Sequence, residues 1–209
     1  MAASSRVSPQ TRGVLLCPSL RRGRAAVPGE PKKRLAALSP RETIVFEDET
    51  GFTLHPRLGR GWAKRGQRLR VATRSVHRER LNIFGWVAPL LGRRGLLRHP
   101  HGNHEGFLAV LRHLRRALRG YTVWVYVDRA GWHRGDEVNT FLASHRDVHL
   151  QYLPTYQPGL NAEERIWRQA RYDATTNRYF ETLDDVWDAV RTHTRRWSPT
   201  MVRRLCHIS

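Results

Sequence analysis

The stretch YTVWVYVDRAGWH, residues 121–133, decides the fold expected of this chain. Its first part, residues 121–127, is almost entirely β-branched and aromatic, and such a nearly continuous apolar run is typical of a strand buried on both faces. The run ends at Asp128. A strand covered on both faces needs neighbouring strands and covering helices, so this stretch predicts a layered α/β fold.

The other hydrophobic patterns of the chain supply those neighbours. Further strands are expected at residues 43–47, 70–73, 81–88, 96–98 and 148–153. Helices are expected at residues 32–38, 103–118, 136–144, 162–172 and 183–197. The strands before residue 100 predict an antiparallel meander, and the later alternation of helix and strand predicts a mixed sheet flanked by helices.

The composition indicates one basic domain. A chain of 209 residues fits a single domain of about 150–200 residues with a substantial core. Lys and Arg outnumber Asp and Glu by 37 to 18, and the formal charge of +19 favours a polyanionic partner, above all nucleic acid. An arginine-rich bias that only solvates the surface is the alternative. Cys17 and Cys206 lack the spacing of a disulfide framework or a zinc module.

The ends and the hydropathy of the chain bear on its location. Residues 1–32 are rich in Arg, Ser, Pro and Gly and have one acid, Glu30, so they are expected to form a disordered basic arm ahead of a folded domain at 33–209. No apolar run approaches the roughly 18 residues that a membrane-spanning helix needs. A cytoplasmic location, associated with the nucleoid, is therefore expected.

Three acids stand in well-marked contexts: Asp48 in TIVFEDETGF (43–52), Asp128, and Glu164 in LPTYQPGLNAEERIW (153–167). The first two end strand-like runs, and Glu164 lies where a helix is expected to begin. Carboxylates at strand ends point into a shared cleft, and oxygen ligands there suit Mg²⁺ or Mn²⁺. The pattern predicts a metal-dependent nuclease centre, with Asp48, Asp128 and Glu164 as its catalytic and metal-binding residues.

The two strand acids each have a competing interpretation. Alternation along a strand lets only one of Asp48 and Glu49 face the cleft, and a solvated acidic turn would explain either residue. Asp128 also fits an ordinary strand-to-loop cap. A carboxylate buried at that position would need a cation or hydrogen-bond donors.

The third acid competes with a helix cap. Asn161 and Glu164 fit a capping box, in which the Glu164 side chain would bond back to the amide of Asn161. Trp167 would lie on the same helical face as Glu164, which favours an inward-facing carboxylate. Glu163 is the alternative acid.

The three motifs resemble the catalytic domain of DDE-type transposases, in the bacterial insertion-sequence branch related to the mariner superfamily. In that family the first acid stands in a D-E-T-like context before a W-x-x-x-G segment, matched here at 48–50 and 62–66. The D-N-A-x-x-H motif is matched by Asp128, Ala130 and His133, with Arg129 in place of Asn. The third motif is close to L-P-P-Y-S-P-E-L-N-P-I-E-x-x-W, matched at 153–167, and 35 residues separate Asp128 from Glu164.

The resemblance covers roughly residues 33–195 and implies a ribonuclease-H-like fold, a mixed five-stranded sheet flanked by helices. In such a fold the strands that carry Asp48 and Asp128 are neighbours, so the two acids share an ion. It also implies two Mg²⁺ (or Mn²⁺) ions, with Glu164 completing one coordination shell. The implied activity is cleavage of DNA at element ends, followed by transfer of the 3′-OH to target DNA, in a homodimer that handles both ends.

Four side chains are expected to contact DNA. Lys64 and Arg65 lie in a basic segment around Trp62, a mixture suited to a phosphate backbone, although a solvated hairpin would show the same pattern. Arg129 and His133 flank Asp128. For His133, orienting a ligand or serving as a buried structural histidine are the alternatives.

Related transposases carry a helix-turn-helix region ahead of the catalytic domain, and 209 residues leave no room for one here. A separately encoded helix-turn-helix half is therefore an expected partner. The third motif departs from the family pattern at Thr155, Gln157, Gly159 and Ala162. Two alternatives follow: a catalytically inactive transposase remnant that binds DNA, and an unrelated basic nucleic-acid-binding protein.

Overall fold

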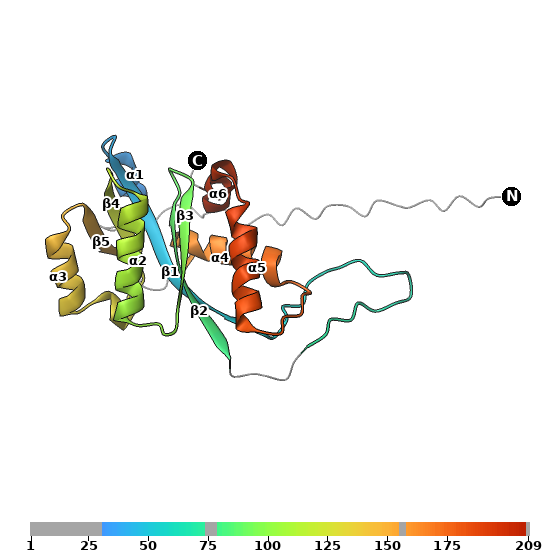
Figure 1. Ribbon diagram of the computed structural model, residues 1–209. Coiled ribbons are helices and arrows are strands. Elements are labelled where there is room, and N and C mark those ends of the chain that lie inside the picture. The colour runs from blue at the N-terminus through green and yellow to red at the C-terminus, as the bar shows by residue number, and fades with distance from the viewer. Residues whose placement is uncertain (1–30, 74–78, 155–157, 208–209) are drawn as a thin grey trace.

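The computed structural model describes residues 31–73, 79–154 and 158–207, and the expected basic arm at 1–32 lies almost wholly outside them. These residues form a five-stranded sheet in the order β3-β2-β1-β4-β5 (Figure 1). The strands are β1 Glu42–Thr53, β2 Arg80–Ala88, β3 Arg93–His99, β4 Thr122–Val127 and β5 Val148–Tyr152. Strands β1 to β3 form an antiparallel meander, and β4 and β5 continue the sheet in parallel with β1. The expected mixed five-stranded sheet is confirmed.

Helices cover both faces of the sheet (Figure 1). Their bounds are α1 Pro31–Ala36, α2 His104–Ala117, α3 Asp136–Ser144, α4 Ala162–Thr175, α5 Leu183–Arg195 and α6 Pro199–Cys206. Two short 3₁₀ turns, η1 Gly131–His133 and η2 Pro158–Leu160, lie after β4 and β5. Helices α2 and α3 pack on one face, and α4, α5 and α6 pack on the other. None of the described helices combines the length and the apolar character needed to cross a bilayer.

Strand β1 divides the core between these two faces. Its residues Ile44, Phe46 and Phe52 belong to the apolar cluster beneath α4, α5 and α6, whereas Val45 belongs to the cluster beneath α2. Successive side chains of a strand point to opposite faces, so even-numbered residues of β1 face α4. This parity decides which acid of the run 47–49 faces α4.

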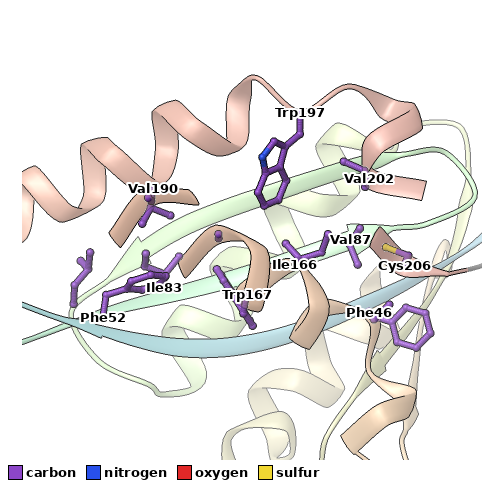
Figure 2. Packing of buried hydrophobic residues seen from close by; sticks show 14 of the residues in the cluster. Phe46, Phe52, Ile83, Val87, Ile166, Trp167, Val190, Trp197, Val202 and Cys206 are labelled. Carbon is purple, nitrogen blue, oxygen red and sulfur yellow. The ribbon is translucent and has the colours of Figure 1, made fainter. Parts of the chain in front are cut away.

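Helix α4 lies close against the sheet. It buries small or branched side chains at every fourth position, namely Ala162, Ile166, Ala170 and Ala174. The neighbouring Trp167 is 2% exposed and packs against the strands, with its ring edge-to-face to Phe52 of β1 (Figure 2). Burying a large apolar side chain of this kind contributes about 1.5–3 kcal/mol. Helix α4 is thereby held firmly over β1 and β2, which makes it a rigid support for the acid at its first turn.

Three expectations about the elements were wrong. β1 continues to Thr53 instead of ending near residue 47, because its ladder with β2 runs on to the pair of Phe52 with Leu81 and Phe52 is buried. Residues 70–73 form no strand, since this mostly exposed segment has no partner strand in the described structure. Helix α6 was not expected, although Ser198 as its N-cap and Pro199 at its first position are ordinary start signals.

The connection between β1 and β2 extends away from the sheet (Figure 1). Near its base, Asn177 fastens this connection to the end of α4: its Oδ1 accepts from the Gly59 amide at 3.0 Å and its Nδ2 donates to the Gly59 carbonyl at 3.1 Å. Further out, Trp62 is 99% exposed. The described part of the connection, residues 54–73, has no Asp or Glu, so it presents an uninterrupted basic surface.

Candidate functional site

The pairing of β1 with β4 brings Asp48 beside Asp128. The two strands are parallel with a constant offset, from Glu42 opposite Thr122 to Phe46 opposite Tyr126. Continued by two residues, the same offset places Asp48 opposite Asp128, just past the end of β4. Two acids that lie 80 positions apart in the sequence therefore become neighbours, as expected.

Asp48 and Glu164 share a pocket of about 340 Å³ on the α4 face of the sheet. Its lining comes from β1, α4 and the β1–β2 connection: Asp48, Thr50, Arg57, Glu164, Trp167, Arg168 and Arg171. The even parity of Asp48 directs it toward α4, whereas Glu49 lies on the α2 face, where a side chain at Gly102 would collide with it. The structure thus puts Asp48, and not Glu49, with the acid of α4.

The electrostatic state of Asp48 reflects this crowding. Burial, followed by the negative charges of Glu47, Asp128 and Glu164, raises the pKa of Asp48 to about 7. Each of the two other predicted acids therefore acts on Asp48 at short range. The charged form of Asp48 is thus disfavoured by burial and by the neighbouring negative charges, and a bound cation would favour it.

Glu164 is not used to cap its helix. Asn161 caps α4 with its own side chain, which accepts from the Glu163 amide at 3.0 Å. The reciprocal bond of a capping box is found at α5, between Thr182 and Asp185, but not at α4 among the described hydrogen bonds. Burial raises the pKa of Glu164, while Arg168 and then Arg165 lower it.

Glu163 faces the interior instead. Its side chain is 0% exposed, neither carboxylate oxygen has a hydrogen-bond partner, and burial raises its pKa well above the usual range. It is absent from the lining of the pocket that Glu164 shares with Asp48. Glu163 is therefore held as a buried group beneath α4, and Glu164 is the acid that α4 presents to Asp48.

Asp128 is more exposed than its place after an apolar strand indicated. Its side chain is 59% exposed, because β4 ends at Val127 and the chain turns outward. Its Oδ1 accepts from the Ala130 amide at 2.8 Å and lies 3.0 Å from Nδ1 of His133. These donors lower the pKa of Asp128, with the hydrogen bond from His133 as the largest contribution. Asp128 therefore needs no cation to offset a cost of burial. The carboxylate whose charged form is disfavoured by burial is that of Asp48.

His133 is buried between two acids. It is 4% exposed, with Nδ1 toward Asp128 and Nε2 3.4 Å from Oε2 of Glu47, which is itself 0% exposed. Burial alone would lower the pKa of His133, but the interactions of its ring with the carboxylates of Asp128 and Glu47, which accept from it, outweigh burial and raise the pKa to about 9. A buried imidazolium with both nitrogens facing carboxylates does not reach a DNA phosphate, which corrects the expected DNA contact. Its contact with Asp128 fits the alternative expectation of a histidine that orients a ligand residue.

The acids fit a hard divalent cation in their chemistry, though they do not form a closed shell. Asp48, Asp128 and Glu164 offer carboxylate oxygens only, the ligands that Mg²⁺ and Mn²⁺ prefer. The adjacent Glu47 is fully buried with His133 as its ion-pair partner, and burial raises its pKa. Within residues 31–73, 79–154 and 158–207, no group of three or more His, Cys, Asp or Glu side chains is gathered closely enough to hold an ion.

Basic residues line the pocket of Asp48 and Glu164, and others lie exposed elsewhere on the described surface. Lys64, Arg65 and Arg129 are exposed, so the structure leaves them accessible to a polyanion. Sequence reasoning missed Arg168 and Arg171, which line the pocket. They follow Glu164 by four and seven positions, the spacing that places side chains on one helical face, so the signal was present in the sequence. Arg171 is tied to β1, because it donates to Thr50 Oγ1 and, at 3.3 Å, to the Gly51 carbonyl.

Comparisons with known proteins agree with this arrangement. A family model described as DDE superfamily endonuclease matches residues 43–187. The "Insertion element IS630 uncharacterized 39 kDa protein" of Shigella sonnei is 28% identical over 148 residues, which cover 70% of this chain and 43% of that protein. The "Uncharacterized protein y4pE/y4sA" of Sinorhizobium fredii is 31% identical over 105 residues, covering 50% of this chain and 75% of that protein. The chain thus spans less than half of the Shigella sonnei relative.

Solved structures of Mos1 transposase share the fold. The Mos1 strand transfer complex aligns with a TM-score of 0.63 at 18% identity, covering 84% of this chain and 54% of that one. The catalytic domain of Mos1 mariner transposase aligns with a TM-score of 0.57 at 17% identity, covering 84% of this chain and 80% of that one. These matches confirm the ribonuclease-H-like fold class. Because the family model covers more than half of the residues, the chain belongs to the DDE superfamily of endonucleases.

Proposed function

We propose that this chain is the catalytic part of a transposase, which cleaves DNA strands at element ends and then joins the freed 3′-OH to target DNA. The observation that carries the proposal is the position of Asp48, which lies opposite Asp128 when the β1–β4 offset is continued and lines one pocket with Glu164. Three separated sequence motifs supply Asp48, Asp128 and Glu164, which supports a common role for these acids. Family membership supports the same reaction class.

In this proposal Asp48, Asp128 and Glu164 would hold one or two Mg²⁺ or Mn²⁺ ions. The ions would supply Lewis-acid stabilisation of the phosphoryl oxygens and a stronger nucleophile, first water and then the 3′-OH. Structures of Mos1 are described with Mn and with Mg, and that metal use is extended here to this chain as part of the proposal.

The chain's own residues would hold and position the DNA. His133 fixes the carboxylate of Asp128 through the 3.0 Å contact of its Nδ1, so that one oxygen keeps a constant direction. Arg168 would bind a phosphate next to Glu164, and Lys64, Arg65 and Arg129 would bind the flanking backbone, with an affinity that falls as salt increases. A homodimer and a separately encoded helix-turn-helix half complete the proposal, since two element ends must be recognised and handled together.

The first test is strand nicking by the purified chain. A labelled duplex with element-end sequence, incubated with Mg²⁺ or Mn²⁺, should be nicked by the wild type, while Asp128→Asn should lose this activity by on the order of 10³-fold or more, because a carboxylate that carries metal and charge is removed. Asp188→Asn is the matched control, an exposed acid of α5 that pairs with Arg191. It should retain full activity.

Two outcomes would count against the enzyme. DNA binding without nicking under either metal would identify a non-cutting DNA-binding protein. Nicking that persists in Asp128→Asn would remove Asp128 from the site.

Arg168 gives a second prediction. The residue is exposed and lines the pocket. Among the described residues it forms no ion pair with a carboxylate, so its guanidinium is available to a phosphate. Arg168→Gln should lower kcat/KM about 10- to 100-fold, as expected for loss of a charged hydrogen bond. Because Arg168 lowers the pKa of Glu164, the acidic limb of the pH–rate profile should also move to higher pH. Arg195→Gln, an exposed arginine of α5, should change neither quantity.

A further inference from the structure

A second pocket lies on the opposite face of the sheet from the acids. It has a volume of about 270 Å³ and lies between the C-terminal ends of α2 and α3. Its lining residues, here called the α2 arginine pocket, are Arg112, Arg115, Arg116, Arg119, Gly120, Phe141, His145 and Asp147. Figure 1 shows α2 and α3 side by side on this face. Asp147 is the one acid among the lining residues, so the pocket is strongly positive.

The four arginines of this pocket form a row at the C-terminal end of α2. Arg112, Arg115 and Arg116 belong to the last turns of the helix, where spacings of three and four residues from Arg112 place them on one helical face, and Arg119 follows in the turn after the C-cap Leu118. Arg115 is paired, with its Nε 2.7 Å from Oδ2 of Asp147. Arg112, Arg116 and Arg119 are exposed and have no carboxylate within ion-pair distance among the described residues. Three guanidinium groups therefore remain available to a ligand.

The helix itself does not require these cations. Basic residues near a helix C-terminus commonly compensate its unpaired carbonyls and its dipole. Here Arg93, from β3, donates to the Ala117 carbonyl at 3.0 Å, and the Leu118 amide donates to the Leu114 carbonyl at 2.8 Å. Other groups therefore cap the end of α2, so capping alone does not explain why the four arginines are there.

The floor of the pocket is aromatic. Phe141 and His145 stack with a centroid separation of 4.2 Å and an interplanar angle of 23°, and the Arg112 guanidinium lies 6.0 Å from the Phe141 ring centroid. The position of the row is therefore set by packing against α3. Several exposed guanidinium groups held over a packed aromatic base suit a ligand with more than one anionic group.

The pocket is too far from the acids to serve the same stretch of DNA. Gly120 lines the pocket and Thr122 begins β4, while Asp128 follows its end. Six strand residues at roughly 3.3 Å each separate the two sites by about 20 Å. The pocket also lies with α2 and α3, whereas Asp48 and Glu164 face the pocket under α4. A strand seated at the acids would have to pass around the edge of the sheet to reach the arginines.

We propose that the α2 arginine pocket binds the phosphate backbone of a second DNA segment, separate from the DNA at the acids. Guanidinium forks match phosphate oxygens, and three unpaired guanidinium groups in one pocket can contact successive phosphates of a backbone. An acidic protein segment is the competing ligand. Several unpaired cations with a single acid in the lining favour the repeating charge of a nucleic-acid backbone.

The test compares two charge-matched triple variants of the full chain. One replaces the row (Arg112→Ala/Arg116→Ala/Arg119→Ala), and the other removes exposed arginines of α5, its C-cap and α6 (Arg195→Ala/Arg196→Ala/Arg204→Ala). Binding of a fluorescent 20-base-pair duplex is measured in EDTA between 50 and 200 mM salt. The row variant should lower the slope of log K against log salt by about 2 to 3, and the control by less than about 1. Alanine favours helices, so the row variant should fold, and circular dichroism checks this.

A footprint locates the contact on the wild type. Phenylglyoxal modification, followed residue by residue with mass spectrometry, should slow about tenfold at Arg112, Arg116 and Arg119 when duplex is present. Equal slope changes in the two triple variants would overturn the proposal, because only net charge would then matter. Protection by poly-glutamate but not by DNA would overturn it in favour of an acidic protein partner. Neither readout involves cleavage, so a chain that binds here without nicking DNA refutes only the proposed catalytic function.

Discussion

Asp48→Asn is expected to abolish strand cleavage and, at the same time, to stabilise the metal-free protein at alkaline pH. The loss of cleavage, on the order of 10³-fold or more, follows because Asp48 lies opposite Asp128 in the sheet, shares a pocket with Glu164, and as a neutral amide would bind a divalent cation poorly. Addition of Mn²⁺ should raise the Tm of the wild type and leave that of Asp48→Asn nearly unchanged. This second measurement reports cation binding without relying on activity.

The gain in stability follows from the raised pKa of Asp48. A carboxyl group whose pKa rises on folding to about 7 favours the folded state at low pH, and that contribution is lost as the pH increases from about 4 to 7. At pH 8 the ionised carboxylate is repelled by Glu47, Asp128 and Glu164, and Asn removes this repulsion. After allowance for partial exposure and for the shared network, Asp48→Asn should increase the free energy of unfolding by about 1–3 kcal/mol at pH 8.

Urea denaturation in EDTA at pH 5 and pH 8 measures this effect. At pH 5 the carboxyl group is still protonated in the folded state but already ionised in the unfolded state, so the difference in stability between the variant and the wild type should be about one third of that at pH 8. Glu137→Gln, which neutralises an exposed acid of α3, is the control and should show no comparable dependence on pH. Equal stability of Asp48→Asn and the wild type at both pH values would show that Asp48 carries no electrostatic strain.

Gly85→Ala is expected to displace the helix that carries Glu164. Gly85 is buried in β2, opposite Asp48 in the ladder, and a methyl group there would lie 2.5 and 2.7 Å from Cζ2 and Cη2 of Trp167 and would also collide with Glu163. Trp167 is buried, so α4 must shift to make room. Overpacking of this kind costs about 1–3 kcal/mol, and a shift of about 1 Å at Glu164 should lower cleavage about 100-fold.

A matched glycine and a rescue variant make this prediction specific. Gly131→Ala is the control, since nothing lies within 4 Å of the added methyl group, and its stability should change by less than about 0.5 kcal/mol. In Gly85→Ala/Trp167→Phe the smaller ring relieves the collision, so the double variant should be less destabilised than the sum of the single changes. Strict additivity would show that the two residues do not press on each other.

The strand and helix pattern of the chain was readable from local sequence wherever hydrophobic periodicity was regular. The run at 121–127 and the helices at 103–118 and 136–144 agree with β4, α2 and α3 within one residue at each end. The errors occurred where a partner element decides the outcome. β1 extends past Asp48 because β2 continues beside it, and residues 70–73 stay outside the sheet because no strand pairs with them.

For the candidate site, too, local sequence indicated some features and the packing of distant segments decided others. The motifs named Asp48, Asp128 and Glu164, and the resemblance supplied their order, but local sequence allowed Glu49 and Glu163 equally. Strand parity and the packing of α4 made the choice, since Asp48 and Glu164 share a pocket while Glu163 is fully buried. The exposure of Asp128 and the burial of His133 depend on where β4 ends, which the sequence does not state.

By itself, then, the sequence determined the elements, the basic charge and the three acidic motifs, because these depend on side-chain chemistry and short-range periodicity. Only the tertiary structure decided that an offset of 80 residues places Asp48 opposite Asp128. It also decided that burial and three other carboxylates raise the pKa of Asp48 to about 7. The reason is physical. Burial and mutual charge arise between segments far apart in the chain, and no local pattern encodes the distance between them.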